Sequence, residues 1–356
     1  MTPKGNSIII HGGGLVDPSK YVLLRLAHNL TELYDKVYIG KYSFESLCTP
    51  EFWLEYNEEL EKGLEKKRGT YFGTSRHVNL ATDYVLCQKA INCLKEAAIC
   101  TVVVAGGDGS SRQVAEINDT FMKNGINIVF AIPLTVDGIN GGESIGFTQA
   151  VRESVRQIEN VAATALETRD VGGFGVLIAE TQGRNRDDIL ANTLKYFNDQ
   201  KCVANCELDD LLLRVIPANI KTNLDKLINE INVSNKRTLV LLSEGAHKKG
   251  DKKDKAFLIE NLSKRINRKV RSVTIGYSSQ SNGMTTVDDE REYAKWLDRV
   301  TKIIGENKGK SICIAKDGDL IFNTTIDYYA KLNPREGQKA EIADDLKELM
   351  ISYMAK

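Results

Sequence analysis

Three glycines and a carboxylate follow an apolar, β-branched run at residues 106–110, whose sequence is Gly-Gly-Asp-Gly-Ser. The run itself, residues 101–105, has the composition of a buried parallel strand, and open α/β sheets bind their ligands beyond the carboxyl ends of such strands. Because glycine has no side chain, backbone N–H groups here can approach an anion, and the carboxylate of Asp108 can hold a metal ion beside it. The segment predicts a phosphate site. A tight strand-to-helix turn with a capping aspartate is the alternative.

Two other segments with glycine or polar residues also come directly after apolar runs. Glycines 12–14 follow the run 7–10, an arrangement that suits a phosphate or close packing of the backbone. Thr135 and Asp137 follow the run 126–132. An isolated aspartate in such a place is usually a turn former or a helix cap, so a catalytic role for Asp137 depends on support from its neighbours.

Charged residues accompany three further strand-like runs. Arg184 follows one of them and a glycine, near the expected start of a helix, and a guanidinium can donate to two phosphate oxygens at once. Glu244 follows another run, and Arg271 stands at the start of a third. For each of these residues a surface salt bridge is the alternative interpretation.

Short apolar runs alternate with longer segments of helical period, which is the pattern of βαβ units in a parallel sheet. We expect strands at residues 7–10, 36–39, 100–105, 126–132, 175–179, 238–242, 270–275 and 311–315. We expect helices at residues 21–33, 80–97, 111–123, 148–162, 186–196 and 223–231, and a solvated loop at 247–255. The predicted fold class is α/β with two doubly wound, Rossmann-like parallel-sheet domains, because 356 residues exceed what one core usually serves.

The composition limits the possible partners. Because 48 basic and 48 acidic side chains cancel, there is no electrostatic reason to expect binding to nucleic acid or to an anionic membrane. No apolar stretch approaches membrane-spanning length and no signal peptide is evident, so we expect a cytoplasmic protein. Seven cysteines argue against a disulfide framework, and their spacing from the four histidines indicates no zinc site.

Taken together and in this order, the segments resemble the phosphofructokinase family over nearly the whole chain. They are Gly12-Gly13, residues 69–76 (Gly-Thr-Tyr-Phe-Gly-Thr-Ser-Arg), 106–110, 133–137 (Pro-Leu-Thr-Val-Asp), 145–148 (Ile-Gly-Phe-Thr), 180–184 (Glu-Thr-Gln-Gly-Arg), 243–245 (Ser-Glu-Gly) and Arg271 followed by Gly276. The Gly-Gly-Asp-Gly run also occurs in NAD kinases and diacylglycerol kinases, so the later segments carry the resemblance.

The resemblance implies an ATP-dependent 6-phosphofructokinase, a glycolytic kinase that uses Mg²⁺ to move the terminal phosphoryl group of ATP to fructose 6-phosphate. It implies that Asp137 is the general base, with Thr135 beside it. It further implies that Asp108 organises Mg²⁺ and that Arg184 neutralises charge at the transferred group. The implied donor-binding residues are Gly13, Arg76, Gly106, Gly107, Gly109 and Ser110. The implied substrate-binding residues are Thr135, Gln182, Gly183, Glu244, Arg271 (which acts across a subunit boundary in family members) and Tyr277.

The chain follows the family more closely on the donor side than on the acceptor side. Gly109 favours ATP, because family members that use pyrophosphate have aspartate at this point, whereas Leu134 matches neither donor class. On the acceptor side, residues 135–139 lack the family's second acid. Gln280 replaces an arginine, and Gly175 stands where another arginine is expected.

Three hypotheses follow. The chain is a divergent ATP-dependent 6-phosphofructokinase; or a kinase of the same fold that acts on a different sugar or uses pyrophosphate; or a non-catalytic, nucleotide-binding regulatory relative. Retention of Asp108, Asp137 and Arg184 favours a kinase, because their roles are chemical.

The expected domains are discontinuous in sequence. Residues 1–147 with 278–330 should form a nucleotide-binding (donor) domain, and residues 148–277 with 331–356 a sugar-binding (acceptor) domain. The resemblance implies assembly as a homotetramer, with a dimer as the alternative.

Overall fold

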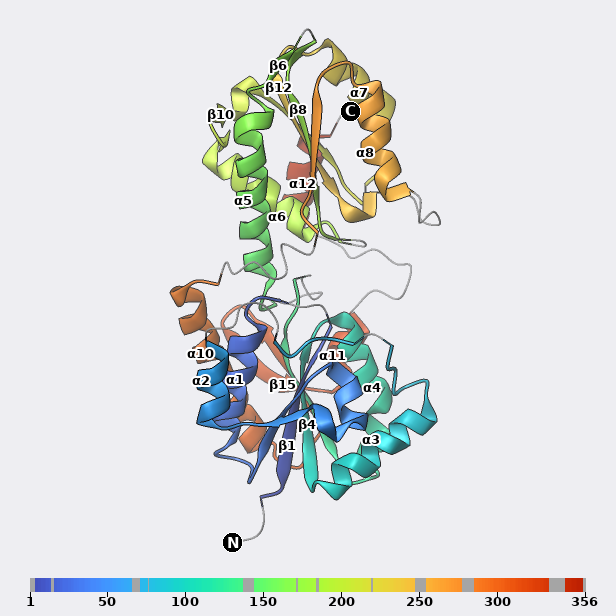
Figure 1. Cartoon of the computed structure of the whole chain (residues 1–356), viewed down its shortest axis with the longest axis vertical. Helices are drawn as coiled ribbons and strands as arrows, with labels where there is room; N and C mark the ends of the chain where they lie inside the picture. Colours follow the sequence, from blue (N-terminus) through green and yellow to red (C-terminus); the bar gives the residue numbers. More distant parts are fainter. Residues whose placement is uncertain are drawn as a thin grey trace. The chain divides into compact units, whose positions relative to one another are not determined.

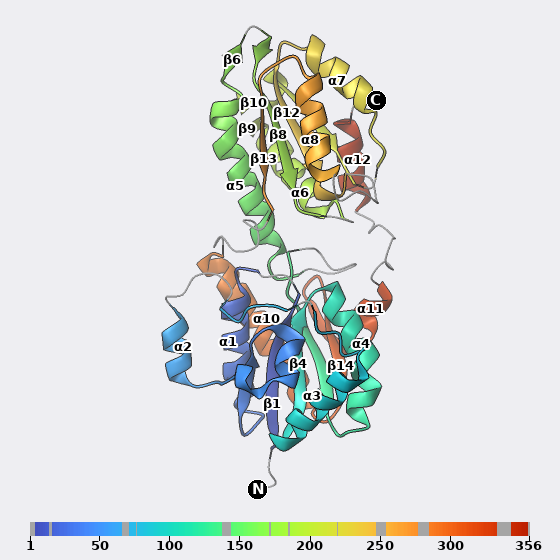
Figure 2. The same ribbon diagram turned by 45° about the vertical axis from the view of Figure 1, so that its right-hand side comes forward.

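The structure, a computed structural model, describes residues 4–13, 16–65, 71–75, 77–136, 144–170, 172–183, 186–218, 220–246, 254–276, 285–332 and 343–354. The chain forms two compact units (Figures 1 and 2). The first consists of Met1–Gln149 and Gln280–Asn333, and the second of Ala150–Ser279 and Pro334–Lys356. Each unit has its own mainly parallel sheet and its own core, which confirms the predicted fold class.

The described strands of the first unit are β1 (Asn6–Gly12), β2 (Val37–Gly40), β3 (Trp53–Glu55), β4 (Ile99–Gly106), β5 (Asn127–Pro133), β14 (Ile312–Asp317) and β15 (Leu320–Thr324). They form one sheet in the order β15-β14-β5-β4-β1-β2-β3. The five central strands are parallel, and β3 and β15 pair antiparallel at the two edges. The carboxyl ends of β1, β4 and β5 therefore lie side by side.

Helices cover both faces of this sheet (Figure 1). The described helices are α1 (Ser19–Leu30), α2 (Glu58–Glu65), α3 (Tyr84–Glu96), α4 (Asp108–Met122), α10 (Val287–Glu306) and α11 (Tyr328–Leu332), with short 3₁₀ helices η1 (Ser43–Cys48) and η2 (Pro50–Phe52). α1 packs with α10, whereas α3 and α4 bury Ile91, Leu94 and Val114 against Ile8 and Val102 of the strands. Burial of these alternating strand residues holds the carboxyl edge of the sheet in place.

The second unit contains a sheet whose described strands are β8 (Val176–Thr181), β11 (Leu211–Ile216), β12 (Arg237–Ser243) and β13 (Val270–Thr274). They are parallel, in the order β11-β12-β8-β13. The helices are α5 (Phe147–Ala165, most of which belongs to this unit), α6 (Asp188–Gln200), α7 (Leu224–Val233), α8 (Asp254–Arg265) and α12 (Asp344–Ser352). Two short hairpins pair β6 (Arg169–Asp170) with β7 (Gly173–Phe174), and β9 (Cys202–Val203) with β10 (Cys206–Glu207).

Alternate residues of β8 enter two separate cores. Leu177 and Ala179 pack in a cluster with residues of α5, α6 and α12, whereas Val176 and Ile178 pack in a cluster with residues of α7 and α8. A strand that buries both faces needs a continuous apolar run rather than an alternating one, as residues 175–179 have.

Every predicted strand and helix is present, with bounds that differ by a few residues. Several elements were not predicted, among them β11, α8 and α10. The loop expected at 247–255 was wrong at its end, because Asp254 and Lys255 begin α8, and residues 247–253 lie outside the described residues. The run that forms β11 is Leu-Leu-Leu-Arg-Val-Ile, and so short an apolar run does not distinguish a strand from a buried helix. α10 carried a readable signal, since Thr286 and Asp289 form a capping box at its start.

Arg268 stabilises the second unit from inside. It is 5% exposed and stands just before β13. Its guanidinium donates hydrogen bonds to the carbonyl oxygens of Lys236 (2.5 Å), Phe174 (2.8 Å), Ile231 (3.1 Å), Ser234 (3.1 Å) and Gly175 (3.4 Å), and to Oγ1 of Thr238 (3.1 Å). Burial lowers the pKa of this guanidinium, and the carbonyl dipoles compensate its charge.

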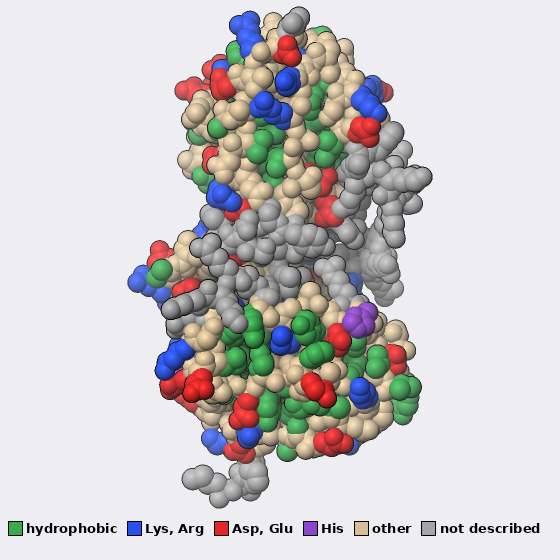
Figure 3. All heavy atoms as spheres, viewed as in Figure 1, with side chains coloured by type: hydrophobic (Ala, Val, Ile, Leu, Met, Phe, Trp, Pro, Cys, Tyr) green, Lys and Arg blue, Asp and Glu red, His purple; other side chains and the backbone are tan. Residues whose placement is uncertain are grey.

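The mixed surface charges and the unpaired cysteines are as the composition predicts. Basic and acidic side chains are interspersed on the face of each unit shown in Figure 3. All seven cysteines are free thiols. In the described part of the chain, no helix is long and apolar enough to span a membrane.

Candidate functional site

Two glycine turns meet at the carboxyl edge of the first sheet. Gly12 of β1 pairs with Gly106 of β4, and the N–H of Gly107 donates to the carbonyl oxygen of Gly12 at 3.3 Å. A Cβ atom at Gly106 would lie 2.1 Å from the carbonyl oxygen of Gly12, so only glycine permits this approach. The turn at Gly13 therefore lies directly beside the turn that begins α4.

α4 begins at Asp108, immediately after that turn. Gly107 is its N-cap, and no side chain caps the helix there. Asp108 occupies the first helical position, so the alternative of a capping aspartate does not describe this turn. The first N–H groups of a helix and its dipole favour an anion, which is the geometry that a phosphate site requires. Ser110 is buried in the first turn.

Gly109 occupies an open position at this helix start. A Cβ atom built there would meet nothing within 4 Å. At Gly107, by contrast, a Cβ atom would lie 3.2 Å from Cβ and Oγ1 of Thr135. Thr135 is therefore adjacent to the turn.

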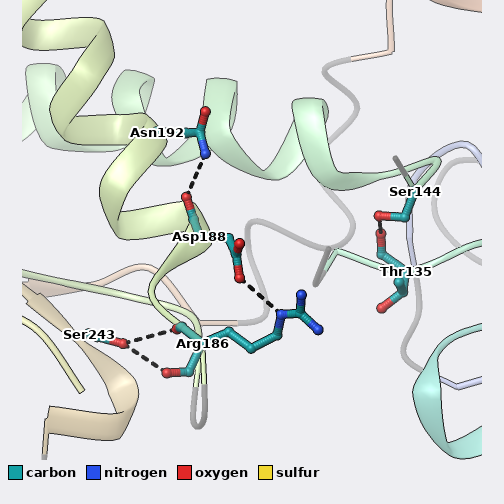
Figure 4. Close-up of polar contacts among 7 residues, drawn as sticks. Thr135, Ser144, Arg186, Asp188, Asn192 and Ser243 are labelled. Atoms are coloured by element: carbon teal, nitrogen blue, oxygen red, sulfur yellow. Dashed lines mark hydrogen bonds and ion pairs between the residues drawn. The ribbon is translucent and has the colours of Figure 1, made fainter. Parts of the chain in front are cut away.

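The segment after β5 is held against this turn by backbone bonds. The N–H of Leu134 donates to the carbonyl oxygen of Gly106 at 3.1 Å, and the N–H of Thr135 to that of Ile145 at 3.0 Å. The hydroxyl of Ser144 donates to the carbonyl oxygen of Thr135 at 3.1 Å (Figure 4). The structure thus brings Thr135 together with Gly13, Gly106, Gly107 and Ser110. Asp137 and Arg76 lie outside the described residues.

A histidine that the sequence analysis did not identify as a candidate lies next to the same turn. His11 is the penultimate residue of β1 and is 1% exposed. Its ring faces the backbone of Leu134, and neither nitrogen makes a hydrogen bond of ordinary geometry within the described ranges. Burial lowers its pKa from 6.5 to about 4, so the ring is neutral near pH 7.

The buried ring of His11 should make the protein less stable in acid. Between pH 6.5 and pH 4 the unfolded chain binds a proton at this residue and the folded chain does not, so stability falls as the pH falls. The lowering of the pKa from 6.5 to about 4 corresponds to a decrease of about 3 kcal/mol in the free energy of unfolding between these pH values. Urea unfolding at several pH values should show this decrease in the unfolding free energy of the wild type. The decrease should be absent in His11→Asn. The control His77→Asn, at a side chain 73% exposed, should retain it. Equal pH dependence in both variants would contradict the assignment.

In the second unit, the ends of β8 and β12 are joined through one serine. The hydroxyl of Ser243 donates to the carbonyl oxygens of Gly183 at 2.8 Å and Arg186 at 3.4 Å (Figure 4). The N–H of Gly245 also donates to Gly183, at 3.1 Å. Gly183 has a φ of +126°, and a Cβ atom there would lie 2.2 Å from the carbonyl oxygen of Arg186. This tight turn places Gln182 and Gly183 beside Glu244. Arg184 and Tyr277 lie outside the described residues.

Two residues of this turn were missed by the sequence analysis. Arg186 is 9% exposed, and its Nε donates to Oδ2 of Asp188 at 2.9 Å (Figure 4). Asp187 is fully buried and accepts a hydrogen bond from the N–H of Ala218 at 2.8 Å. A second arginine two positions after Arg184 was the available signal for Arg186.

Arg271 does not join this group. It is the second residue of β13 and pairs with Leu177, near the amino end of β8, whereas Gly183 and Glu244 follow the carboxyl ends of their strands. The five residues from Leu177 to Thr181 are joined by four steps of extended strand, which span about 13 Å. Within one chain, Arg271 therefore lies toward the amino ends of the strands and Glu244 beyond their carboxyl ends.

The described residues contain no cluster of three His, Cys, Asp or Glu side chains that could hold a metal ion. Mg²⁺ does not require one, because it commonly binds through one or two carboxylates together with phosphate oxygens and water. The carboxylate of Asp108, at the start of α4, is a ligand of the kind that Mg²⁺ uses in such sites.

Comparison with known proteins shows what the chain is similar to. The sequence profile of the family described as Phosphofructokinase matches residues 6–294. An ATP-dependent 6-phosphofructokinase 3 of Bacteroides thetaiotaomicron is 23% identical over 293 residues, which cover 80% of this chain and 81% of that protein. An ATP-dependent 6-phosphofructokinase of Lysinibacillus sphaericus is 34% identical over 140 residues, 38% of this chain and 40% of that protein.

Solved structures show the same fold at low identity. A phosphofructokinase from Saccharomyces cerevisiae has a TM-score of 0.69 at 18% identity; the match covers 98% of this chain but only 47% of the yeast chain, so this chain spans about half of its length. A pyrophosphate-dependent phosphofructokinase from Marinobacter aquaeolei has a TM-score of 0.72 at 15% identity, with 99% and 92% of the two chains covered.

Proposed function

Because the chain belongs to the phosphofructokinase family, we propose that it transfers the terminal phosphoryl group of ATP to fructose 6-phosphate and forms fructose 1,6-bisphosphate. The observation that supports this most is the convergence of Gly13, Gly106, Gly107 and Thr135 at the start of α4. Adjacent glycine turns at a helix N-terminus suit a polyphosphate donor. We therefore propose that the first unit binds the donor and the second the acceptor.

Phosphoryl transfer requires positioning and charge stabilisation from the protein. We infer that Asp137 accepts the proton of the attacking sugar hydroxyl, with Thr135 next to it. Arg184 would donate hydrogen bonds to the transferred group, where negative charge is spread over its oxygens. Asp108 would hold Mg²⁺, which when bound neutralises charge on the donor phosphates. Gly13, Arg76, Gly106, Gly107, Gly109 and Ser110 would line the donor.

The acceptor site would be built from the turn that Ser243 holds. Gln182, Gly183 and Glu244 come together there, and Glu244 would accept hydrogen bonds from sugar hydroxyls. Tyr277 would complete this site. Arg271 would contact the sugar phosphate from another subunit, because in its own chain it lies toward the opposite edge of the sheet. This role requires an oligomer, and we propose a cytoplasmic homotetramer or dimer.

The open position at Gly109 predicts how the donor is selected. Gly109→Asp should fold normally, because a Cβ atom there meets nothing within 4 Å and a carboxylate at a helix start is favourable. The same carboxylate should repel the phosphates of ATP and raise the KM for ATP by about tenfold or more, since like charges placed together cost several kcal/mol. Steady-state kinetics with ATP and with pyrophosphate measure the change. The control Gly109→Ala, which adds volume without charge, should change the KM for ATP much less.

Two alternative functions remain testable with the same assay. The resemblance in fold to a pyrophosphate-dependent phosphofructokinase makes pyrophosphate the competing donor. Loss of the family's arginines at positions 175 and 280 makes a different sugar the competing acceptor. Rates with both donors across fructose 6-phosphate, other sugar phosphates and free sugars distinguish these cases. A free sugar that reacts faster than every sugar phosphate would overturn the proposed acceptor. Nucleotide binding without any transfer would indicate a non-catalytic regulatory protein.

A further inference from the structure

His11 is a buried polar residue that the proposed mechanism does not use. Its side chain is 1% exposed, and across the described segments neither ring nitrogen makes a hydrogen bond of ordinary geometry. A buried polar group that is short of hydrogen bonds destabilises a protein, and native structures keep few such groups. The presence of a histidine here therefore needs an explanation other than stability.

The ring of His11 extends over the neighbouring strand toward the segment after β5. Ile8 and Ile10 of β1 pack in the core cluster formed with residues of α3 and α4, so side-chain alternation places His11 on the opposite face of the sheet. The residue paired with His11 is Ala105 of β4, the strand that lies between β1 and β5. Because Ala105 carries only a methyl group, the imidazole can extend over β4 and face the backbone of Leu134.

The backbone group that faces the ring is the carbonyl of Leu134. The backbone of Leu134 raises the pKa of His11, although burial lowers it by more. A backbone group raises the pKa of a histidine when it accepts a hydrogen bond from the ring, so this group is the carbonyl oxygen. The N–H of Leu134 donates elsewhere, to the carbonyl oxygen of Gly106 at 3.1 Å. A neutral imidazole carries one N–H, which can be directed at the Leu134 carbonyl.

The peptide unit between Leu134 and Thr135 is thus constrained from both sides. Its N–H, which belongs to Thr135, donates to the carbonyl oxygen of Ile145 at 3.0 Å, and its carbonyl faces His11. Because a peptide unit is planar, constraints on its two polar atoms fix its orientation. That orientation determines how the chain presents Thr135 beside Gly107 at the glycine turn.

We propose that His11 is a positioning residue for phosphoryl transfer: its neutral imidazole holds the carbonyl of Leu134 and thereby orients Thr135 at the start of α4. This inference rests on the proposed phosphotransferase function, in which Thr135 lies next to the general base. Asp137, the proposed base, follows two residues after Thr135 in the sequence. Proteins keep locally unfavourable groups mainly at functional sites, which explains a buried imidazole that costs stability.

The test separates positioning from a structural role by comparing activity with stability. His11→Leu removes the ring N–H and should lower kcat, with the fastest donor and acceptor pair, by about 10- to 100-fold, the usual effect of a small misplacement at a reacting site. The KM for each substrate should change by less than about threefold, because binding of the ground state is not affected. Urea unfolding at pH 7 should have a midpoint equal to that of the wild type or higher, because an apolar side chain replaces a buried polar one.

Conservative variants should restore the rate. Asparagine and glutamine place an amide N–H near the positions of Nδ1 and Nε2 of the ring, respectively. At least one of His11→Asn and His11→Gln should therefore have a kcat within about fivefold of the wild type, since the N–H that meets the carbonyl of Leu134 is restored.

Hydrogen exchange at the amide of Thr135 gives a second measurement, which does not depend on the acceptor. In His11→Leu this amide should exchange about tenfold faster or more than in the wild type, because its peptide unit is held from one side only. The control Ser7→Ala removes another buried polar side chain from the same face of β1. Ser7 is fully buried and pairs with Val37 and Thr101 at the amino end of the strand. This control should change neither kcat nor exchange at Thr135.

Three results would overturn the proposal. The first is an unchanged kcat in His11→Leu. The second is a loss of kcat that accompanies a lower unfolding midpoint, which would indicate a purely structural role. The third is failure of both His11→Asn and His11→Gln to restore the rate.

Failure of the proposed function would give a different result. A wild-type protein that transfers phosphoryl groups to no acceptor would refute that function. Faster exchange at Thr135 in His11→Leu, but not in Ser7→Ala, would then still support the positioning of Thr135 by His11, and unchanged exchange would refute it.

Discussion

Replacing Asp137 by serine should lower kcat for phosphoryl transfer by about 10²- to 10⁴-fold, the usual contribution of a general base. In the proposed mechanism this carboxylate acts only on the proton of the attacking hydroxyl. The Kd for ATP, measured by titration, should therefore stay close to that of the wild type. Serine is smaller than aspartate and polar, so it removes the proton acceptor and leaves room for both substrates.

A matched variant separates loss of the base from loss of a surface charge. Asp319→Ser makes the same substitution at an exposed residue of the turn between β14 and β15 and should leave kcat unchanged. A kcat for Asp137→Ser within a few-fold of the wild type would exclude Asp137 as the general base. An equal loss of ATP binding would instead assign Asp137 to the donor site.

Replacing Arg268 by methionine should destabilise the second unit by about 3–5 kcal/mol, because buried hydrogen-bond acceptors that lose their donor cost about 1–3 kcal/mol each. The guanidinium donates to five carbonyl oxygens and one hydroxyl. Methionine fills a similar volume and supplies no donor. The lowered pKa of Arg268 shows that burial of the charge carries its own cost, so the net effect is smaller than the sum over its bonds.

Urea unfolding followed by hydrogen exchange can localise this effect. In Arg268→Met the amides of β8 and β13 should lose protection while those of β1 and β4 keep it, because the hydrogen bonds of Arg268 join segments of the second unit alone. The control Arg265→Met removes a salt bridge to Asp225 from a side chain 45% exposed and should cost about 1 kcal/mol or less. A similar small cost for Arg268→Met would show that Arg268 is not a structural centre of this unit.

The sequence determined those features that depend on neighbouring residues. The Val-rich run before Gly106 identified a buried strand, and the glycines after it identified a turn that approaches an anion, because strand period and turn chemistry are local. The alternation of such runs with helical segments was enough to predict the α/β class. The same local reasoning failed for β11, where six residues, mostly apolar, suit either a strand or a buried helix until neighbouring strands pair with them.

Tertiary structure alone decided which distant residues meet. Nothing near Arg268 in the sequence indicates that Phe174, Ile231 and Lys236 turn their carbonyl oxygens toward it. The burial of His11 and the approach of Tyr71 to Lys41 likewise arise from the packing of segments that are far apart in the chain. Hydrogen bonds, burial and ring contacts act over a few ångströms of space, whereas a sequence pattern reports only on residues a few positions apart, so these contacts appear only when the sheets are assembled.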